Sequence, residues 1–450
     1  WVVHPLTTQA VTYIIQRGES LMGLWYLLML YALVRSAQSP HPRRWRALSV
    51  CSCALGMLSK PVMVSAPLVA LLYDRIFLAS GWRQLVRHRG WLYAGLAATW
   101  LLLPLLMRNV PPMSEWTSGF GTPYVPSVLE YARTQPGVIL HYLRLCIWPH
   151  PLVFDYAWPI ATTVREIWGP AAAIGRLLCA SLWALKRHPA IGFIGAAFFL
   201  LLAPTSSVFP IADPAFEYRM YLPLAAVLTL IVTGAFTLLR TLPGSDAARR
   251  VVMALSVGAA AVLFIFLTVQ RNAVYASEEM LWRDTIAKRP ANARAQHNLG
   301  RTSAVQGRFE EAVQRYQEAV RLSPGFAIAH NNLGVALRRQ GKLQEALASY
   351  RKALQFAPNA AHVHNNAGVV LRQLGEHEQA MTHYTRALEL DPRYAKARAN
   401  LGVLLASQGR LKEAIMQLEE SLRLDPQDQE TQANLGEARQ QQQRASRTME

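Results

Sequence analysis

The chain has few charged residues and few cysteines for its length of 450 residues. Asp, Glu, Lys and Arg make up 16% of the sequence, whereas hydrophobic residues make up 52%. These averages combine two unlike halves, because long apolar runs occur only in the first. The four cysteines are Cys51, Cys53, Cys146 and Cys179. All lie in apolar stretches, so we interpret them as small buried hydrophobic residues and expect neither a disulfide nor a metal site from them.

The sequence also lacks a glycine-rich nucleotide loop and a paired-carboxylate metal motif. We therefore assign no metal ligands and no cofactor, and we make no prediction about a metal requirement. The formal net charge of +18 would favour nucleic acid on a soluble domain. Here much of that charge lies in loops between apolar segments, and the C-terminal part also contains many glutamates. We expect no nucleic-acid partner.

What the C-terminal part does contain is a period of 34 residues. Asparagine recurs at this step, in Asn298, Asn332, Asn366, Asn400 and Asn434. Alanine recurs in the same register from Ala312, and a proline closes each unit from Pro324. The pattern resembles the tetratricopeptide repeat, in which two antiparallel helices form each unit and successive units stack. It predicts four repeats over 293–428, preceded by a half-repeat helix within 272–292 and followed by a capping helix and tail over 429–450.

Apolar runs dominate residues 1–271, which we predict to be a multi-spanning membrane domain. Its candidate spans are 12–34, 47–59, 62–77, 91–107, 167–186, 190–204, 221–240 and 251–270. Several are shorter than the ~20 residues that cross a bilayer comfortably. The predicted fold class is therefore all-α, a polytopic transmembrane helical domain followed by a tetratricopeptide α-solenoid.

Basic residues gather in alternate loops between these spans. The clearest clusters lie within 35–46 and 75–89, at Lys186 and Arg187, and within 240–250. The positive-inside rule places these loops in the cytoplasm. The repeats then emerge on the opposite side, in the periplasm of a bacterium, with the protein in the inner membrane, or in the lumen of the endoplasmic reticulum if it is eukaryotic.

Three junctions on that external side are more polar than a structural loop requires. Their ionisable residues are His4, Arg17 and Glu19 in the first, Lys60 in the second, and Glu217 and Arg219 in the third. Ionisable groups at membrane depth are costly and are usually paired or functional.

These motifs resemble the membrane domain of the transmembrane-and-tetratricopeptide O-mannosyltransferases and their bacterial relatives, which are GT-C glycosyltransferases. The resemblance implies transfer of a sugar from a polyprenyl-phosphate donor to a protein acceptor on the non-cytoplasmic face. It implies that Lys60, Arg17 and Arg219 bind the lipid phosphate, and that Glu217 orients Arg219 or binds the acceptor. His4 and Glu19 are further candidates for the donor site.

Each candidate also has a structural alternative. Arg17 and Glu19 would pair at a helix end, Lys60 would extend to the membrane interface without a ligand, and Glu217 would pair with Arg219. His4, which precedes a proline, would stabilise a turn.

No catalytic base is assigned. In the family it is an acidic residue in the first external loop, and the chain begins at Trp1, so we expect a missing N-terminal segment to carry it. The enzyme assignment therefore depends on that segment. The alternative is a non-catalytic, membrane-anchored tetratricopeptide scaffold for protein–protein interaction.

The asparagine ladder predicts a peptide-binding groove that holds the acceptor or another partner protein. Carboxamides at one height on successive repeats pair with the main chain of an extended peptide without reading its sequence. The groove candidates are Asn298, Asn332, Asn366 and Asn400, supplemented by Asn331 and Asn365 and by His297 in the first repeat. On this reading the ladder faces solvent without buried partners. The alternative is that each asparagine bonds within its own repeat.

Overall fold

The computed structural model describes residues 3–12, 17–108, 126–206, 213–241, 243 and 245–449. These residues form helices and connecting loops and contain no strand, so the predicted all-α fold class is confirmed. Contacts divide the chain into a membrane unit, Trp1–Gly119 with Tyr124–Pro290, and a repeat unit, chiefly Ala291–Glu450.

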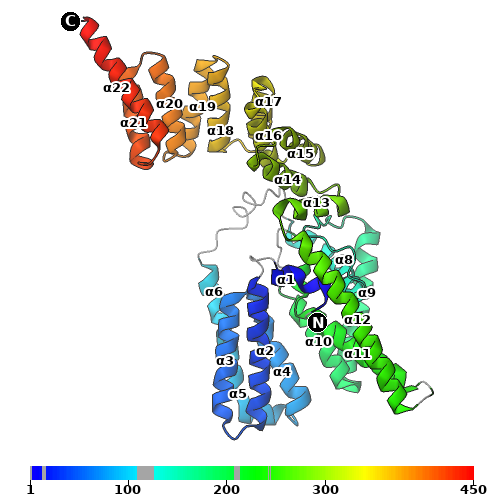
Figure 1. The fold of residues 1–450 in the computed structure, drawn as a ribbon. Coiled ribbons are helices and arrows are strands. Elements are labelled where there is room, and N and C mark those ends of the chain that lie inside the picture. Colours follow the sequence, from blue (N-terminus) through cyan, green and yellow to red (C-terminus); the bar gives the residue numbers. More distant parts are fainter. Residues whose placement is uncertain are drawn as a thin grey trace. The chain divides into compact units, whose positions relative to one another are not determined.

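The membrane unit consists of long helices joined by short helical turns (Figure 1). Its elements are η1 (Pro5–Thr7), α1 (Thr8–Thr12), α2 (Arg17–Gln38), α3 (Pro42–Ser59), η3 (Pro61–Ser65), α4 (Ala66–Tyr73), η4 (Asp74–Leu78), α5 (Trp82–Ala98), η5 (Thr99–Leu101), α6 (Leu102–Met107), α8 (Val128–Ile147), α9 (Val164–Arg187), α10 (Pro189–Leu202), η6 (Glu217–Met220), α11 (Pro223–Thr241), α12 (Asp246–Val274) and α13 (Glu278–Lys288).

Local sequence signals explain where several of these helices begin. Ser127 and Thr163 each form a capping box with the glutamate three residues later, at the starts of α8 and α9. Such boxes satisfy backbone N–H groups that the first turn leaves without a partner. Proline occupies the first position of α3 and α10, where its missing N–H costs nothing.

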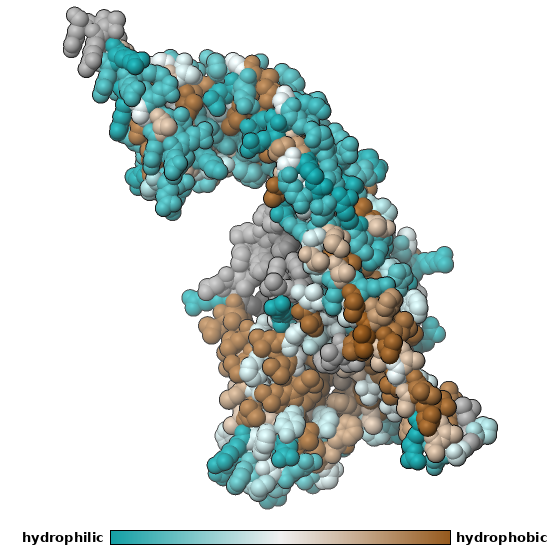
Figure 2. Space-filling view, in the orientation of Figure 1, coloured by the Kyte–Doolittle hydropathy of each residue, from teal (hydrophilic) through white to brown (hydrophobic). Residues whose placement is uncertain are grey.

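Five helical segments among the described residues are long and apolar enough to cross a membrane: Arg17–Gln38, Pro61–Leu78, Val164–Arg187, Pro223–Thr241 and Asp246–Val274. The most apolar window of α12 is 0% buried and that of α11 is 6% buried. Apolar side chains that face outward in this way need lipid around them. Figure 2 shows the resulting hydrophobic surface, with a hydrophilic cap below it at the lower end of α2 and α3. The chain is a multi-pass membrane protein.

The remaining predicted spans are helical as well. The segment 190–204 corresponds to α10, a shorter apolar helix. The segments 47–59 and 91–107 lie in α3 and in α5 to α6. Both α3 and α5 begin with arginine-rich turns. These arginines lower the mean hydropathy of the two helices.

The repeat unit stacks antiparallel helix pairs one after another (Figure 1). Its helices are α14 (Ala293–Val305), α15 (Phe309–Leu322), α16 (Ala327–Arg339), α17 (Leu343–Phe356), α18 (Ala361–Gln373), α19 (His377–Leu390), α20 (Ala395–Ser407), α21 (Leu411–Leu424) and α22 (Gln429–Met449).

The recurring glycine allows each helix pair to pack closely. A Cβ added to Gly334 would lie 2.6 Å from the ring of Tyr350, and one added to Gly368 would lie 2.7 Å from the ring of Tyr384. Both tyrosines are fully buried. The 34-residue period therefore reflects a repeated glycine–tyrosine contact, with small alanines filling the rest of the core.

Candidate functional site

A narrow cavity in the membrane unit brings the first and third predicted motifs together. Glu19 in the first turn of α2 and Arg219 in η6 both line it, as does Tyr218, which precedes Arg219 in the third motif. The rest of the lining is mainly apolar and comes from α2, η3, α10 and the start of α11: Met22, Val62, Leu201, Thr205, Tyr221, Leu222 and Pro223.

Lys60 reaches this cavity through Glu19. Its Nζ lies 2.9 Å from Glu19 Oε1, with the side chain of Glu19 4% exposed and that of Lys60 25% exposed. The ammonium also lies over the ring of Tyr218, 5.1 Å from the ring centroid. Lys60 is extended, as a residue before proline prefers to be, and this places it between α3 and η3. The second motif thus joins the other two.

Glu19 is positioned by α2. A carboxylate in the first turn of a helix faces the positive end of the helix dipole and is stabilised there. The predicted Arg17–Glu19 pair is not the arrangement found, because Glu19 pairs with Lys60 and Arg17 is exposed at the start of the helix. Arg17 is not among the residues lining the cavity.

Arg219 makes its hydrogen bonds mainly to the protein main chain. Its guanidinium donates to the carbonyls of Asp213 and Pro214, each at 2.6 Å, and to that of Thr205 at 3.3 Å. It also donates to the hydroxyl of Tyr131 at 3.1 Å. These contacts fix the backbone that forms one wall of the cavity. Binding of a phosphate by Arg219 stays a prediction.

Glu217 belongs to a different network. It is fully buried and accepts from the Val153 N–H at 2.6 Å and from the Tyr156 hydroxyl at 3.0 Å. Its ionic partner is Arg271 of α12, at 3.4 Å, so the predicted Glu217–Arg219 pair is wrong. In the tight turn η6, residues two apart point in different directions. Burial raises the pKa of Glu217, and the guanidinium of Arg271 acts against that rise.

The same network continues to α13. Arg271 also pairs with Asp284 at 3.2 Å, and Asp284 pairs with Lys288 at 2.7 Å. Lys288 in turn donates to the Leu152 carbonyl at 2.9 Å. The carboxylate of Glu217 is therefore a structural centre that holds η6, α12 and α13 together.

His4 makes the contacts of a turn-stabilising histidine. It is fully buried, its Nδ1 accepts from the Leu6 N–H at 3.2 Å, and its Nε2 lies 3.1 Å from the Cys146 carbonyl. Burial lowers its pKa to about 4. His4 is not among the residues lining the cavity.

Two residues of this region were not among the predicted site residues. Tyr218 lies beneath the Lys60 ammonium and lines the cavity. Gln9 accepts from the Tyr218 N–H at 3.1 Å and donates to the Phe154 carbonyl at 3.2 Å. The aromatic residues of the third motif are the sequence feature that favours such a cation–π contact.

In the repeat unit the asparagines bond across neighbouring repeats. Asn366 donates to Asn331 at 3.0 Å and Asn400 donates to Asn365 at 2.8 Å. Asn332 is 2.9 Å from His297 Nε2 in the same way.

The acceptors Asn331, Asn365 and His297 are buried. The expectation that these asparagines have no buried partner is therefore wrong, and so is the alternative that they bond only within one repeat. The signal was present in the adjacent pairs His297-Asn298, Asn331-Asn332 and Asn365-Asn366.

Comparison with known proteins identifies both parts of the chain. Residues 2–107 match the family model described as dolichyl-phosphate-mannose-protein mannosyltransferase. Tetratricopeptide models match residues 277–325, 298–361, 368–409 and 395–428. The predicted resemblance is confirmed. The chain is a glycosyltransferase-like membrane protein with tetratricopeptide repeats.

Curated proteins that are similar to this chain are named protein O-mannosyl-transferases. The chain is 30% identical to protein O-mannosyl-transferase Tmtc2 of Drosophila melanogaster over 141 residues, which is 31% of this chain and 14% of that protein. It is 26% identical to protein O-mannosyl-transferase TMTC1 of Mus musculus over 278 residues, which is 59% of this chain and 26% of that protein. The chain thus spans only a minor part of the relatives that it matches.

Solved structures match the repeat unit. They include TTC0263, a thermophilic TPR protein of Thermus thermophilus, at 26% identity and a TM-score of 0.32, covering 39% of this chain and 93% of that one. YrrB, described as a TPR protein with an unusual peptide-binding site, matches at 25% identity and a TM-score of 0.31, covering 35% of this chain and 81% of that one.

Proposed function

We propose that this protein transfers a hexose from a polyprenyl-phosphate carrier to a protein acceptor, and that the repeats bind the acceptor. The observation that carries the proposal is the Lys60–Glu19 pair beside the cavity. Both residues lie within the region similar to mannosyltransferases.

The pair suits a lipid-linked phosphate. Lys60 keeps a quarter of its side chain exposed while Glu19 is almost fully buried, so the cation is the member that a ligand can approach. A phosphate oxygen on Lys60 would gain a charge-assisted hydrogen bond, with Glu19 holding the ammonium in position.

The donor test uses the protein expressed from its complete coding sequence, including any residues upstream of Trp1, and reconstituted in proteoliposomes. We expect transfer of radiolabelled mannose to an acceptor protein from polyprenyl-phosphate mannose and none from GDP-mannose. Transfer from GDP-mannose alone would refute the lipid-linked donor. No transfer from either donor, with folding verified by circular dichroism, would favour the scaffold.

The repeats belong on the side of the membrane where the lipid-linked sugar is used, the periplasm or the lumen of the endoplasmic reticulum. Support comes from the basic residues at the end of α2, the start of α3, the end of α11 and the start of α12. These helix ends lie at the lower end of the membrane unit in Figure 1. Reporter fusions placed after residue 430 test this. A cytoplasmic signal from that fusion would contradict the proposed topology.

A further inference from the structure

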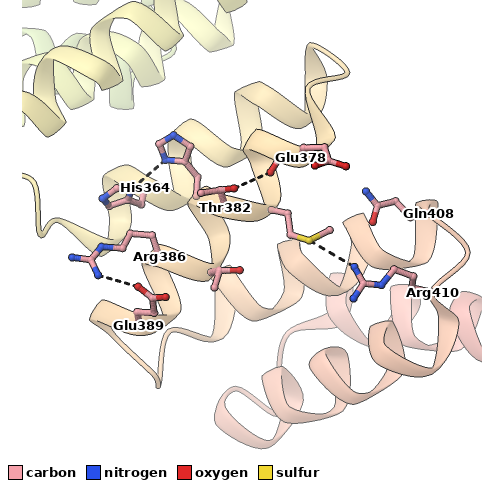
Figure 3. Close-up of a pocket in the computed structure, with 10 residues that line it drawn as sticks. His364, Glu378, Thr382, Arg386, Glu389, Gln408 and Arg410 are labelled. Carbon is pink, nitrogen blue, oxygen red and sulfur yellow. Dashed lines mark hydrogen bonds and ion pairs between the residues drawn. The ribbon is translucent and has the colours of Figure 1, made fainter.

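Two histidines of the repeat unit face each other across one helix pair. His364 of α18 and His383 of α19 have their Nδ1 atoms 3.1 Å apart, and their ring centroids are 5.2 Å apart. Both side chains are half-buried and line a pocket with Glu378, Arg386 and Gln408 among others. Figure 3 shows this pocket and the contact made by His364.

In the first and fourth repeats the corresponding positions hold ordinary hydrogen-bonded pairs. Arg315 donates to Gln296 at 3.4 Å, and Arg398 donates to Gln417 at 3.2 Å. In each of these pairs one side chain is a donor and the other an acceptor. The same 19-residue spacing joins His364 to His383, where both side chains offer a ring nitrogen that can bind metal.

The outer nitrogen of His364 is fixed by the fold. Its Nε2 lies 3.0 Å from the Pro358 carbonyl. At the equivalent positions Arg398 and Gln432 donate to the carbonyls of the corresponding prolines, each at 2.9 Å. A carbonyl only accepts, so His364 carries its proton on Nε2. Its other ring nitrogen, Nδ1, faces His383.

We propose that His364 and His383 bind one divalent transition-metal ion, such as Zn²⁺, through their Nδ1 atoms, with water completing the coordination. Two imidazole nitrogens each ~2.05 Å from one ion lie ~2.9 Å apart at a right angle and ~3.3 Å apart at the tetrahedral angle. The observed 3.1 Å lies between these values. The Pro358 carbonyl takes the role of the outer partner that orients a ligating histidine.

The proton balance of the site is simple. Without metal, His383 donates its Nδ1 proton to His364. When an ion binds, that proton moves to Nε2 of His383, both rings remain neutral, and each Nδ1 lone pair binds the ion.

The other charges lining the pocket are largely offset. Arg386 pairs with Glu389 at 2.9 Å and Arg410 pairs with Glu413 at 2.6 Å. Among the described residues no cluster of three or more His, Cys, Asp or Glu is arranged to hold a metal. The protein therefore supplies two ligands, and the site is an open one that exchanges its ion.

The experiment measures Zn²⁺ binding by the full chain, purified without a histidine tag and stripped with a chelator. Competition with a chromophoric chelator gives the affinity, and the visible absorption of added Co²⁺ reports nitrogen coordination. The repeats themselves suggest well-tolerated variants. His364→Gln introduces the residue found at 432, and His383→Ser introduces the residue found at 349. The control is His330→Gln. His330 is the equivalent of His364 one repeat earlier, but the equivalent of His383 in that repeat is Ser349, so no second histidine is available there.

We expect one zinc site that weakens about tenfold or more in each test variant and is unchanged in the control. Zinc should also raise the unfolding temperature of the wild-type protein and of the control, because binding stabilises the folded state. Equal affinity in all four proteins would overturn the proposal. So would the absence of zinc-dependent stabilisation in the wild-type protein, a result that needs no variant at all.

Discussion

The Lys60–Glu19 pair allows the proposed donor site to be separated from a purely structural ion pair. Lys60→Met removes the ammonium but keeps an apolar stem of similar length. Glu19 then remains buried without the partner that now lies 2.9 Å away. We compare this variant with Glu19→Gln and with the double variant that carries both changes.

The structure sets the size of each effect on stability. Removing one partner of a buried ion pair costs about 3–5 kcal/mol, and the lower end applies here because Lys60 is a quarter exposed. Glu19→Gln leaves a lysine that can turn toward water, so about 1 kcal/mol is expected. The double variant contains no unpaired charge and should unfold within about 1 kcal/mol of the wild type.

Transfer activity should follow another pattern. If Lys60 binds the donor phosphate, loss of one charge-assisted hydrogen bond, about 1.5–3 kcal/mol, lowers kcat/KM by about 10- to 150-fold. That loss should appear in Lys60→Met and persist in the double variant, although the double variant regains stability. Unfolding in detergent and mannose transfer in proteoliposomes are measured on the same preparations. Activity restored by the double change would refute phosphate binding and leave Lys60 as the counter-ion of Glu19.

Three further predictions concern the repeats. Asn366→Ala should lower the free energy of unfolding by about 1 kcal/mol, because it removes a hydrogen bond to a buried partner; an unchanged denaturation midpoint would contradict this. Gly368→Ala should destabilise by about 1–3 kcal/mol through its clash with Tyr384, whereas Gly436→Ala, with nothing within 4 Å, should not; equal midpoints would show that the close contact is unimportant. Burial lowers the pKa of His297 to about 4, so the unfolded chain binds more protons below pH ~6.5 and stability falls by up to about 3 kcal/mol as the pH drops toward 4. His297→Gln should flatten that acid-side slope in denaturation measured from pH 7 to pH 4.

The repeat fold could be predicted from the sequence because its period has a local physical cause. Each Gly–Tyr contact, such as that of Gly334 with Tyr350, joins two residues that are only 16 positions apart in the chain. Their spacing is therefore visible in the sequence as a repeating pattern. Membrane helices were predictable for a similar reason, because an apolar run is itself the property that lipid selects. Neither inference required knowledge of contacts between distant segments.

The candidate site was only partly predictable because its pairings are tertiary. The resemblance implied that Arg17, Lys60 and Arg219 share one phosphate site, with Glu19 as a further candidate. In the structure Arg219 lines the cavity and Lys60 reaches it through Glu19, whereas Arg17 does not line it. Arg219 binds main-chain carbonyls, and every residue offers a carbonyl. Glu217 binds Arg271, 54 residues away, and no periodic spacing marks that pair.

The Glu217–Arg271 and Glu19–Lys60 pairs therefore have different physical roles. Glu217 and Arg271 are both almost fully buried, and Glu217 accepts further hydrogen bonds from Val153 and Tyr156. This pair therefore orders η6 against α12 and leaves little room for a ligand. Glu19 and Lys60 are asymmetric, since the carboxylate is buried and the ammonium is partly open. Only such an asymmetric pair can present a positive charge to an incoming phosphate while the protein holds the other end in place. By ordering η6, the Glu217–Arg271 pair fixes Tyr218 and Arg219 at the wall of the cavity. The buried network that contains this pair therefore contributes to the site, although it lies outside the cavity.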